Sequence, residues 1–298
     1  AQAGVHRQVR QVTANGLRFA VDEAGEGDRV ALCLHGFPES RYSWRYQLPM
    51  LAQAGWHAIA PDMRGYGDSD RPVEQSAYAM DRLVEDAGAL FDAYGARQRL
   101  LIAHDWGALI AWTFALRKTR ALDGLVIMNV PHPAVFREVW QRSWDQKAKS
   151  WYVAFFQIPW LPERMLTANN ARAVGEMFRG MAVNKAAFPD DVLDHYRQNA
   201  LKPGAMTAMI NYYRANLRVL ADRSTPAPMI ETPTLMIWGE ADAALSIENT
   251  RGYEKLVRDF TLERLPRVSH WVQQEAPDEV NARLASWLAR KGLAPGSD

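Results

Sequence analysis

Residues 100–108, Leu100-Leu101-Ile102-Ala103-His104-Asp105-Trp106-Gly107-Ala108, form the stretch that decides the fold. Its first four residues are apolar, as in a buried strand, and the residues after Asp105 suit a helix. Gly107 permits the close packing of strand against helix that a sharp turn at Asp105 requires. The stretch therefore predicts a nucleophile elbow with Asp105 at its corner, although an aspartate here would also suit the N-cap of the helix.

Short apolar runs and helix-length segments alternate on both sides of this turn. The runs lack the polar alternation of half-exposed strands, which indicates a parallel sheet covered on both faces. They lie at 30–34, 57–60, 100–103, 125–128 and 234–238, with a last strand signal at 261–265 and predicted helices at 42–54, 80–94 and 107–118. Asn15-Gly16, between runs at 9–13 and 17–22, predicts an N-terminal hairpin. We therefore expect a mostly parallel, doubly wound α/β sheet.

Residues 131–227 interrupt this alternation. Helical patterns predominate there, at 141–156, 170–182, 190–199 and 206–220, and strand signals resume at Thr234. A helical block between two strand-bearing halves indicates an inserted cap and not a tandem domain. The predicted division is a first core part at 1–130, a cap at 131–227 and a second core part at 228–298.

Composition argues against several classes of function. The chain of 298 residues has 35 Lys and Arg against 34 Asp and Glu, so its net charge of +1 gives no basis for binding nucleic acid or an anionic membrane. The histidines show no metal-ligand spacing, and no phosphate-cradling glycine loop or dinucleotide motif occurs. We expect no metal and no cofactor. Cys33, inside an apolar run, is expected to be a buried strand residue and not a reactive thiol.

The expected environment is the cytoplasm. No apolar run approaches the roughly 20 residues of a membrane span, and the first residues lack the apolar region of a signal peptide. The sequence leaves open whether a leader preceded Ala1, and whether the protein is a monomer or a homodimer.

Two later residues complete a reaction centre with Asp105. His270 follows the last predicted strand and is the natural general base. Asp242, just after the strand at 234–238, could orient and stabilise its imidazole, with Glu240 as the rival candidate. The order nucleophile, acid, histidine is that of the α/β-hydrolase fold. A protein of this fold that only binds a ligand would be favoured if one of the three were missing.

His35-Gly36-Phe37-Pro38, after the strand at 30–34, is a candidate oxyanion-hole segment. The backbone N–H groups of Phe37 and Trp106 could hold a developing negative charge. The Phe37–Pro38 bond is a candidate for the cis form, which the sequence does not settle.

An aspartate nucleophile restricts the chemistry. Its carboxylate is already ionised near neutral pH. It suits displacement at an sp³ carbon, which gives an alkyl-enzyme ester that water, activated by His270, then hydrolyses. Substrates should therefore be epoxides or organohalides.

Four segments carry a family resemblance: His35-Gly36-Phe37-Pro38-Glu39-Ser40, Tyr42-Ser43-Trp44-Arg45, residues 60–67 and His104-Asp105-Trp106-Gly107. Together they resemble the α/β-hydrolase-fold epoxide hydrolases, which act on the cyclic ether bond of epoxides. The resemblance implies an epoxide hydrolase in which two cap tyrosines donate O–H groups to the epoxide oxygen. Segments 151–159 and 211–214 resemble the two tyrosine regions, which places that role on Tyr152 and Tyr213.

The principal alternative is a haloalkane dehalogenase, which shares the fold and the aspartate nucleophile. There the Trp106 indole would bind halide. Fluoroacetate-type dehalogenases carry arginine where Trp106 stands and a carboxylate where Asn129 stands, which disfavours them. We expect a small apolar epoxide and water as the partners, with Phe37, Pro38, Trp106, Phe155 and Met209 lining the substrate site. The sequence indicates neither the physiological epoxide nor the enantiomer or carbon attacked.

Overall fold

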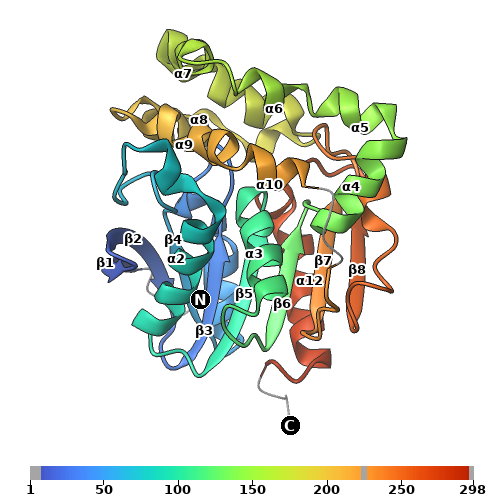
Figure 1. Ribbon diagram of the computed structural model, residues 1–298. Coiled ribbons are helices and arrows are strands. Elements are labelled where there is room, and N and C mark those ends of the chain that lie inside the picture. Colours follow the sequence, from blue (N-terminus) through green and yellow to red (C-terminus); the bar gives the residue numbers. More distant parts are fainter. Residues whose placement is uncertain (1–7, 223–226, 295–298) are drawn as a thin grey trace.

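The computed structural model describes residues 8–222 and 227–294 and has one eight-stranded sheet at its centre (Figure 1). The strands are β1 (Gln8–Ala14), β2 (Leu17–Ala24), β3 (Arg29–Leu34), β4 (His57–Pro61), β5 (Gln98–His104), β6 (Gly124–Met128), β7 (Thr234–Gly239) and β8 (Phe260–Leu265). Their order is β1-β2-β4-β3-β5-β6-β7-β8. The pairs β1–β2 and β2–β4 are antiparallel and the others parallel. The predicted hairpin and mostly parallel sheet are confirmed.

Helices cover both faces of the sheet. The core helices are α1 (Gln47–Gln53), α2 (Met80–Ala93), α3 (Trp106–Arg117), α11 (Val272–Glu275) and α12 (Pro277–Arg290). Successive strand residues point to opposite faces. Leu32 and Leu34 pack with residues of α2 and α3, whereas Ala31 and Cys33 pack with residues of α1 and α12. This double burial explains the unbroken apolar runs in the sequence.

Between β6 and β7 the described chain is helical, and we call helices α4–α10 the cap. They are α4 (Pro133–Arg142), α5 (Trp144–Lys149), α6 (Trp151–Phe155), α7 (Leu161–Met181), α8 (Asp190–Leu201), α9 (Ala205–Ala215) and α10 (Leu217–Ala221). In Figure 1, α5 to α9 lie across the top of the sheet. The predicted boundary at 227 adjoins residues 223–226, which lie outside the described ranges, as do the two ends, 1–7 and 295–298.

Some predicted helices are interrupted. The helix predicted at 141–156 is three segments, because Ser143 adopts an extended ψ of 115° and its hydroxyl caps α5 by accepting from Gln146 N–H. The helix predicted at 206–220 breaks at Asn216. Its side-chain amide accepts from the Met80 N–H and donates to the Tyr78 carbonyl. The segment at 42–54 divides into a 3₁₀ turn, Arg41–Trp44, and α1.

Helix α7 differs most from its prediction. It begins at Leu161, not at residue 170, and residues 168–171 inside it have non-helical backbone angles. Asn169, Asn170 and Ala171 have φ between 51° and 59°. The left-handed region is disfavoured for residues other than glycine, least so for asparagine. The kink explains why the helical pattern in the sequence appears to start only after it.

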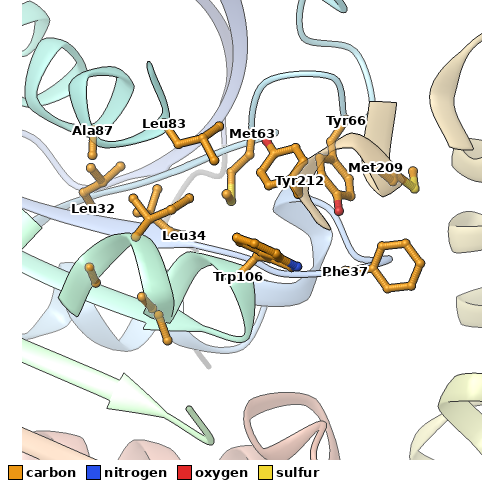
Figure 2. Packing of buried hydrophobic residues seen from close by; sticks show 14 of the residues in the cluster. Leu32, Leu34, Phe37, Met63, Tyr66, Leu83, Ala87, Trp106, Met209 and Tyr212 are labelled. Carbon is orange, nitrogen blue, oxygen red and sulfur yellow. The ribbon is translucent and has the colours of Figure 1, made fainter. Parts of the chain in front are cut away.

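Below the cap, aromatic side chains join it to the sheet. Figure 2 shows Trp106, the first residue of α3, between Leu34 and Met63 on one side and Phe37 on the other. The Trp106 ring lies 5.7 Å from the ring of Tyr212 on α9. The elbow is thus buried beneath the cap. Among the described residues, no helix is both long and apolar enough to cross a membrane.

Replacing Gly107 by alanine should destabilise the fold. A Cβ there would lie 2.3 Å from the Leu34 carbonyl oxygen and 2.6 Å from that of His35, both backbone atoms that cannot yield without moving β3. We expect Gly107→Ala to cost about 2 kcal/mol or more of unfolding free energy, measured from the urea midpoint at constant slope.

Gly180→Ala is the matched control, because a Cβ at this helical glycine meets nothing within 4 Å. It should stabilise the protein by up to about 1 kcal/mol through helix propensity. Equal unfolding midpoints for the two variants would contradict the close approach of α3 to β3.

Candidate active site

Asp105 lies at a strained corner between β5 and α3. Its backbone angles are φ 53° and ψ −125°, outside the regions that L-residues prefer. The turn is held from both sides, because β5 is an inner strand and the Gly107 N–H donates to the His35 carbonyl at 3.0 Å. Such strain persists only where the surrounding structure enforces it. It presents the Asp105 carboxylate at the carboxyl edge of the sheet.

The segment after β3 contacts this carboxylate directly. The Phe37 N–H donates to Asp105 Oδ1 at 2.7 Å, and the Phe37–Pro38 bond is cis. Gly36 passes so close that a Cβ there would lie 2.2 Å from Asp105 Cβ. A donor therefore stands at the predicted Phe37 position. Trp106 N–H, at the start of α3, remains a predicted second donor.

His270 lies between two carboxylates. Its Nδ1 is 2.6 Å from Asp242 Oδ2, and its Nε2 is 3.7 Å from Asp105 Oδ2. The second distance exceeds a direct hydrogen bond. Glu240 is solvent-exposed, so of the two candidates it is Asp242 that contacts the histidine. The structure thus brings together the three residues picked from the sequence.

Asp242 is buried and fully hydrogen-bonded. Its Oδ1 accepts from the N–H groups of Ala244 and Leu245 at 2.7 and 3.0 Å, and its Oδ2 accepts from Asn129 Nδ2 at 2.9 Å as well as from His270. Burial raises the pKa of Asp242, but the charge of His270 and these hydrogen bonds outweigh it and lower the pKa. This role of Asn129 was not predicted from the sequence.

The same charges act on the imidazole. Burial alone would lower the pKa of His270, but the neighbouring carboxylates of Asp242 and Asp105 raise it well above its ordinary value. With Asp105 ionised, His270 therefore carries a proton near neutral pH. Loss of the Asp105 charge would remove one of the two causes and lower the pKa.

A second buried pair, missed from the sequence, supports the backbone of His270. His104 Nδ1 is 2.7 Å from Glu39 Oε1, and its Nε2 is 2.7 Å from the His270 carbonyl. Both partners are acceptors, so a ring that donates from both nitrogens satisfies both contacts. Burial opposes the charge of Glu39, yet His104 and neighbouring donors lower its pKa to about 2. The sequence did contain a signal for this pair, because Glu39 and His104 are titratable residues within two of the segments that carry the family resemblance.

The cap places two phenols over Asp105. Tyr152 of α6 and Tyr213 of α9 have ring centroids 6.0 Å apart, and both line the same cavity as Asp105 and Trp106. The cavity has a volume of about 600 Å³. Burial, followed by the charge of Asp105, raises the pKa of both phenols, so they stay protonated at neutral pH. The arrangement thus brings a carboxylate and two protonated phenols to one largely apolar cavity, with His270 behind the carboxylate.

The residues that line this cavity are mostly not the predicted binding residues. Its walls include Leu109, Leu116, Phe136, Trp140, Leu217 and Leu220, from α3, α4 and α10. Phe37, Pro38, Phe155 and Met209 are not among its lining residues. Phe37 instead packs on Phe156 and Tyr213, and Met209 is fully buried. Only Trp106 of the five predicted binding residues lines it, so a binding role for the other four stays a prediction.

Within residues 8–222 and 227–294, no group of three or more His, Cys, Asp or Glu side chains is arranged to hold a metal ion.

Comparison with known proteins gives one consistent family. The alpha/beta hydrolase fold family matches residues 30–277. Epoxide hydrolase 4 of Homo sapiens is 38% identical over 96% of this chain and 79% of that protein. Epoxide hydrolase A of Mycobacterium tuberculosis is 33% identical over 94% of this chain and 96% of that protein. An epoxide hydrolase of Bacillus megaterium, solved with an inhibitor, matches with a TM-score of 0.86 at 29% identity, over 94% of this chain and 99% of that chain.

Neutralising Asp105 should lower the pKa of His270. Asp105→Asn removes one of the two negative charges that raise this pKa while leaving Asp242 in place. We expect the His270 titration, followed by NMR of the imidazole nitrogens, to move to lower pH in the variant. His132, whose pKa burial lowers to about 4, should titrate unchanged and serves as the internal control. An unmoved His270 titration would show that Asp105 does not contribute.

Proposed function

The chain belongs to the epoxide hydrolases of the α/β-hydrolase fold family, and from this premise we propose that it converts epoxides to vicinal diols through an ester on Asp105. One observation carries the proposal: Tyr152, Tyr213 and Asp105 line the same cavity, and His270 and Asp242 stand behind the carboxylate. An acid on the far side of the reacting carbon is what an epoxide needs and a halide does not.

In the first step Asp105 attacks an epoxide carbon. We assign the attack to Oδ2, because Oδ1 accepts the hydrogen bond from Phe37 N–H. The new carbon–oxygen bond forms as the epoxide carbon–oxygen bond breaks, and the departing oxygen takes a proton from Tyr152 or Tyr213. Both phenols keep that proton until the alkoxide develops, because their pKa values are raised.

In the second step water attacks the Asp105 carboxyl carbon. Esterification removes the Asp105 charge and lowers the pKa of His270, so His270 gives up its proton to the tyrosinate left by the first step and, now neutral, can accept a proton from water. Phe37 N–H, with Trp106 N–H, then holds the oxyanion. Collapse restores the carboxylate and expels the second diol oxygen, which takes up a proton. The remaining proton returns to His270, so the sum is epoxide plus water giving diol.

The buried partners keep the base in place. Asp242, held by Asn129 and two backbone N–H groups, orients His270 and stabilises its cation. His104 and Glu39 fix the carbonyl of the same residue. We assign these groups to positioning, since none of them reaches the cavity around Asp105.

The cavity favours an apolar epoxide with a long or bulky substituent. Its walls toward α3, α4 and α10 are leucines and aromatic side chains, and its volume of about 600 Å³ fits a drug-sized molecule. An aryl or alkyl arm would extend along this side while the epoxide stays between Asp105 and the tyrosines. A haloalkane dehalogenase remains the second candidate, favoured by the Trp106 side chain at the same cavity.

The first test separates these two activities. Purified protein is incubated separately with styrene oxide and with a 1-haloalkane, while diol formation and halide release are followed. We expect diol from styrene oxide and no halide. Halide without diol would establish the dehalogenase instead, with the Trp106 indole as halide donor and the two tyrosines as packing residues.

Substitutions test the residues. Asp105→Ala should abolish turnover, and His270→Gln should form the ester but not hydrolyse it, so that mass spectrometry finds the substrate mass on the Asp105 peptide. Turnover at the wild-type rate in Asp105→Ala would refute the mechanism.

The phenols should matter at the first step alone. Tyr152→Phe and Tyr213→Phe should each slow ester formation about 10- to 100-fold, and the double variant more, because each removes a proton donor to the epoxide oxygen. Single-turnover quench experiments with styrene oxide measure this step. Ester formation at the wild-type rate in the double variant would leave the tyrosines as packing residues only.

A further inference from the structure

The residues that follow His270 are bonded to the cap and to the segment just after α7, and one of them also holds the residue before the histidine. Trp271 Nε1 donates to the Met177 carbonyl of α7 at 3.1 Å. Glu275 Oε1 accepts from the N–H groups of Val183 and Asn184, just after α7, at 3.0 and 2.9 Å. Glu275 Oε2 accepts from Ser269 N–H at 3.0 Å. The cap therefore supports the loop as well as covering the cavity.

A third connection starts at Tyr196 on α8. This tyrosine is fully buried and its ring stacks on Phe178 at 4.3 Å. Its hydroxyl lies 2.8 Å from Gln274 Oε1 and 2.7 Å from Ser43 Oγ. Gln274 belongs to α11, which follows His270 directly, so a cap helix contacts the element next to the base.

The orientation of Gln274 is fixed by its neighbours. Arg45 Nη1 donates to Gln274 Oε1 at 2.9 Å, and a guanidinium has no acceptor. The oxygen of the amide must therefore face Arg45, so Tyr196 donates to that same oxygen. The amide nitrogen then faces Glu39 and donates to its Oε2 at 2.8 Å.

From Glu39 the hydrogen bonds continue to the base. Glu39 accepts from His104, and His104 donates to the His270 carbonyl, each at 2.7 Å. We call this run of hydrogen bonds, Tyr196–Gln274–Glu39–His104–His270, the cap relay. Every member is buried, so water competes little for these contacts, and hydrogen bonds are stronger there than in water.

We propose that the cap relay makes Tyr196 a positioning residue for His270, so that the seating of cap helix α8 controls the activation of water. The proposal rests on the proposed function and extends it, because it gives the cap a role in the second step of the reaction. The relay ends on the backbone of His270 and includes none of Asp105, Tyr152 and Tyr213. Its loss should therefore leave ester formation intact and impair hydrolysis.

Geometry supplies the reason for this selectivity. The imidazole must stand within hydrogen-bonding reach of a water that itself faces the Asp105 carboxyl carbon. The space between His270 Nε2 and Asp105 Oδ2 is 3.7 Å, and a small displacement of the His270 backbone changes it directly. Attack by Asp105 on the epoxide does not require His270 in that position. A residue that served the fold alone would not distinguish the two steps.

Tyr196→Phe tests the proposal in the whole protein. Single turnovers with styrene oxide, stopped by acid, give the rate of ester formation from the modified Asp105 peptide and the rate of hydrolysis from diol. We expect ester formation within about twofold of the wild type and hydrolysis at least about fivefold slower, the effect of losing one hydrogen bond. A larger fraction of the variant should carry the ester in steady state.

Tyr78→Phe is the control. Tyr78 is also fully buried, and its hydroxyl donates to the Pro72 carbonyl at 2.7 Å, outside the cap relay. Its removal costs one buried hydrogen bond, where Tyr196→Phe loses two, so the thermal midpoint should fall, though less than in Tyr196→Phe. Neither rate constant should change.

Three results would overturn the proposal: Tyr196→Phe leaves both rates unchanged, slows both equally, or slows ester formation alone. If Tyr196→Phe does not fold, Gln274→Met interrupts the relay one residue nearer the base and must give the same separation of the two rates. Failure of the proposed function looks different, because wild-type protein would then form no ester on Asp105 at all.

Discussion

The negative charge of Asp105 is the constraint around which the rest of the structure is arranged. Asp105 lies at a sharp turn with φ 53°, a backbone angle that is strained for L-residues and persists where the surrounding structure holds it. The strand before Asp105, the helix after it and the loop 35–38 hold this strained backbone in place. Gly36 and Gly107 allow these segments to approach closely. The Phe37 N–H donates to the carboxylate. Without this corner the cavity beneath the cap would have no reactive group at its end.

Burial would penalise this charge and its neighbours if each stood alone. Instead acidic groups alternate with imidazoles: Asp105, His270 and Asp242 form one series, and Glu39 with His104 forms another beside it. The alternation raises the pKa of His270 and lowers those of Asp242 and Glu39 against the effect of burial. The cap makes these interactions strong, because it keeps water away from them.

The cap was the least predictable part of the chain. Its helices have weak boundaries in the sequence, and the breaks at Ser143 and Asn216 depend on hydrogen bonds that the side chains make after folding. The core strands, by contrast, are buried on both faces, and their apolar runs marked them with only small errors at the ends. The predicted binding residues Phe37 and Met209 do not line the cavity: Phe37 packs on Phe156 and Tyr213, and Met209 is fully buried. Tertiary packing sets these side-chain directions, and the sequence pattern does not contain that information.

The sequence by itself determined the order of strands and helices along the chain and the elbow at Asp105. It also determined the positions after β7 and β8 where Asp242 and His270 lie. These features are local, since the end of a parallel strand fixes where the next side chain points. Only the tertiary structure decided which buried polar groups pair. Glu39 meets His104 from 65 residues away, and His104 meets the His270 carbonyl from 166 residues away. Such partners are chosen by the need to satisfy every buried donor and acceptor in the packed molecule, a condition that no single stretch of sequence contains.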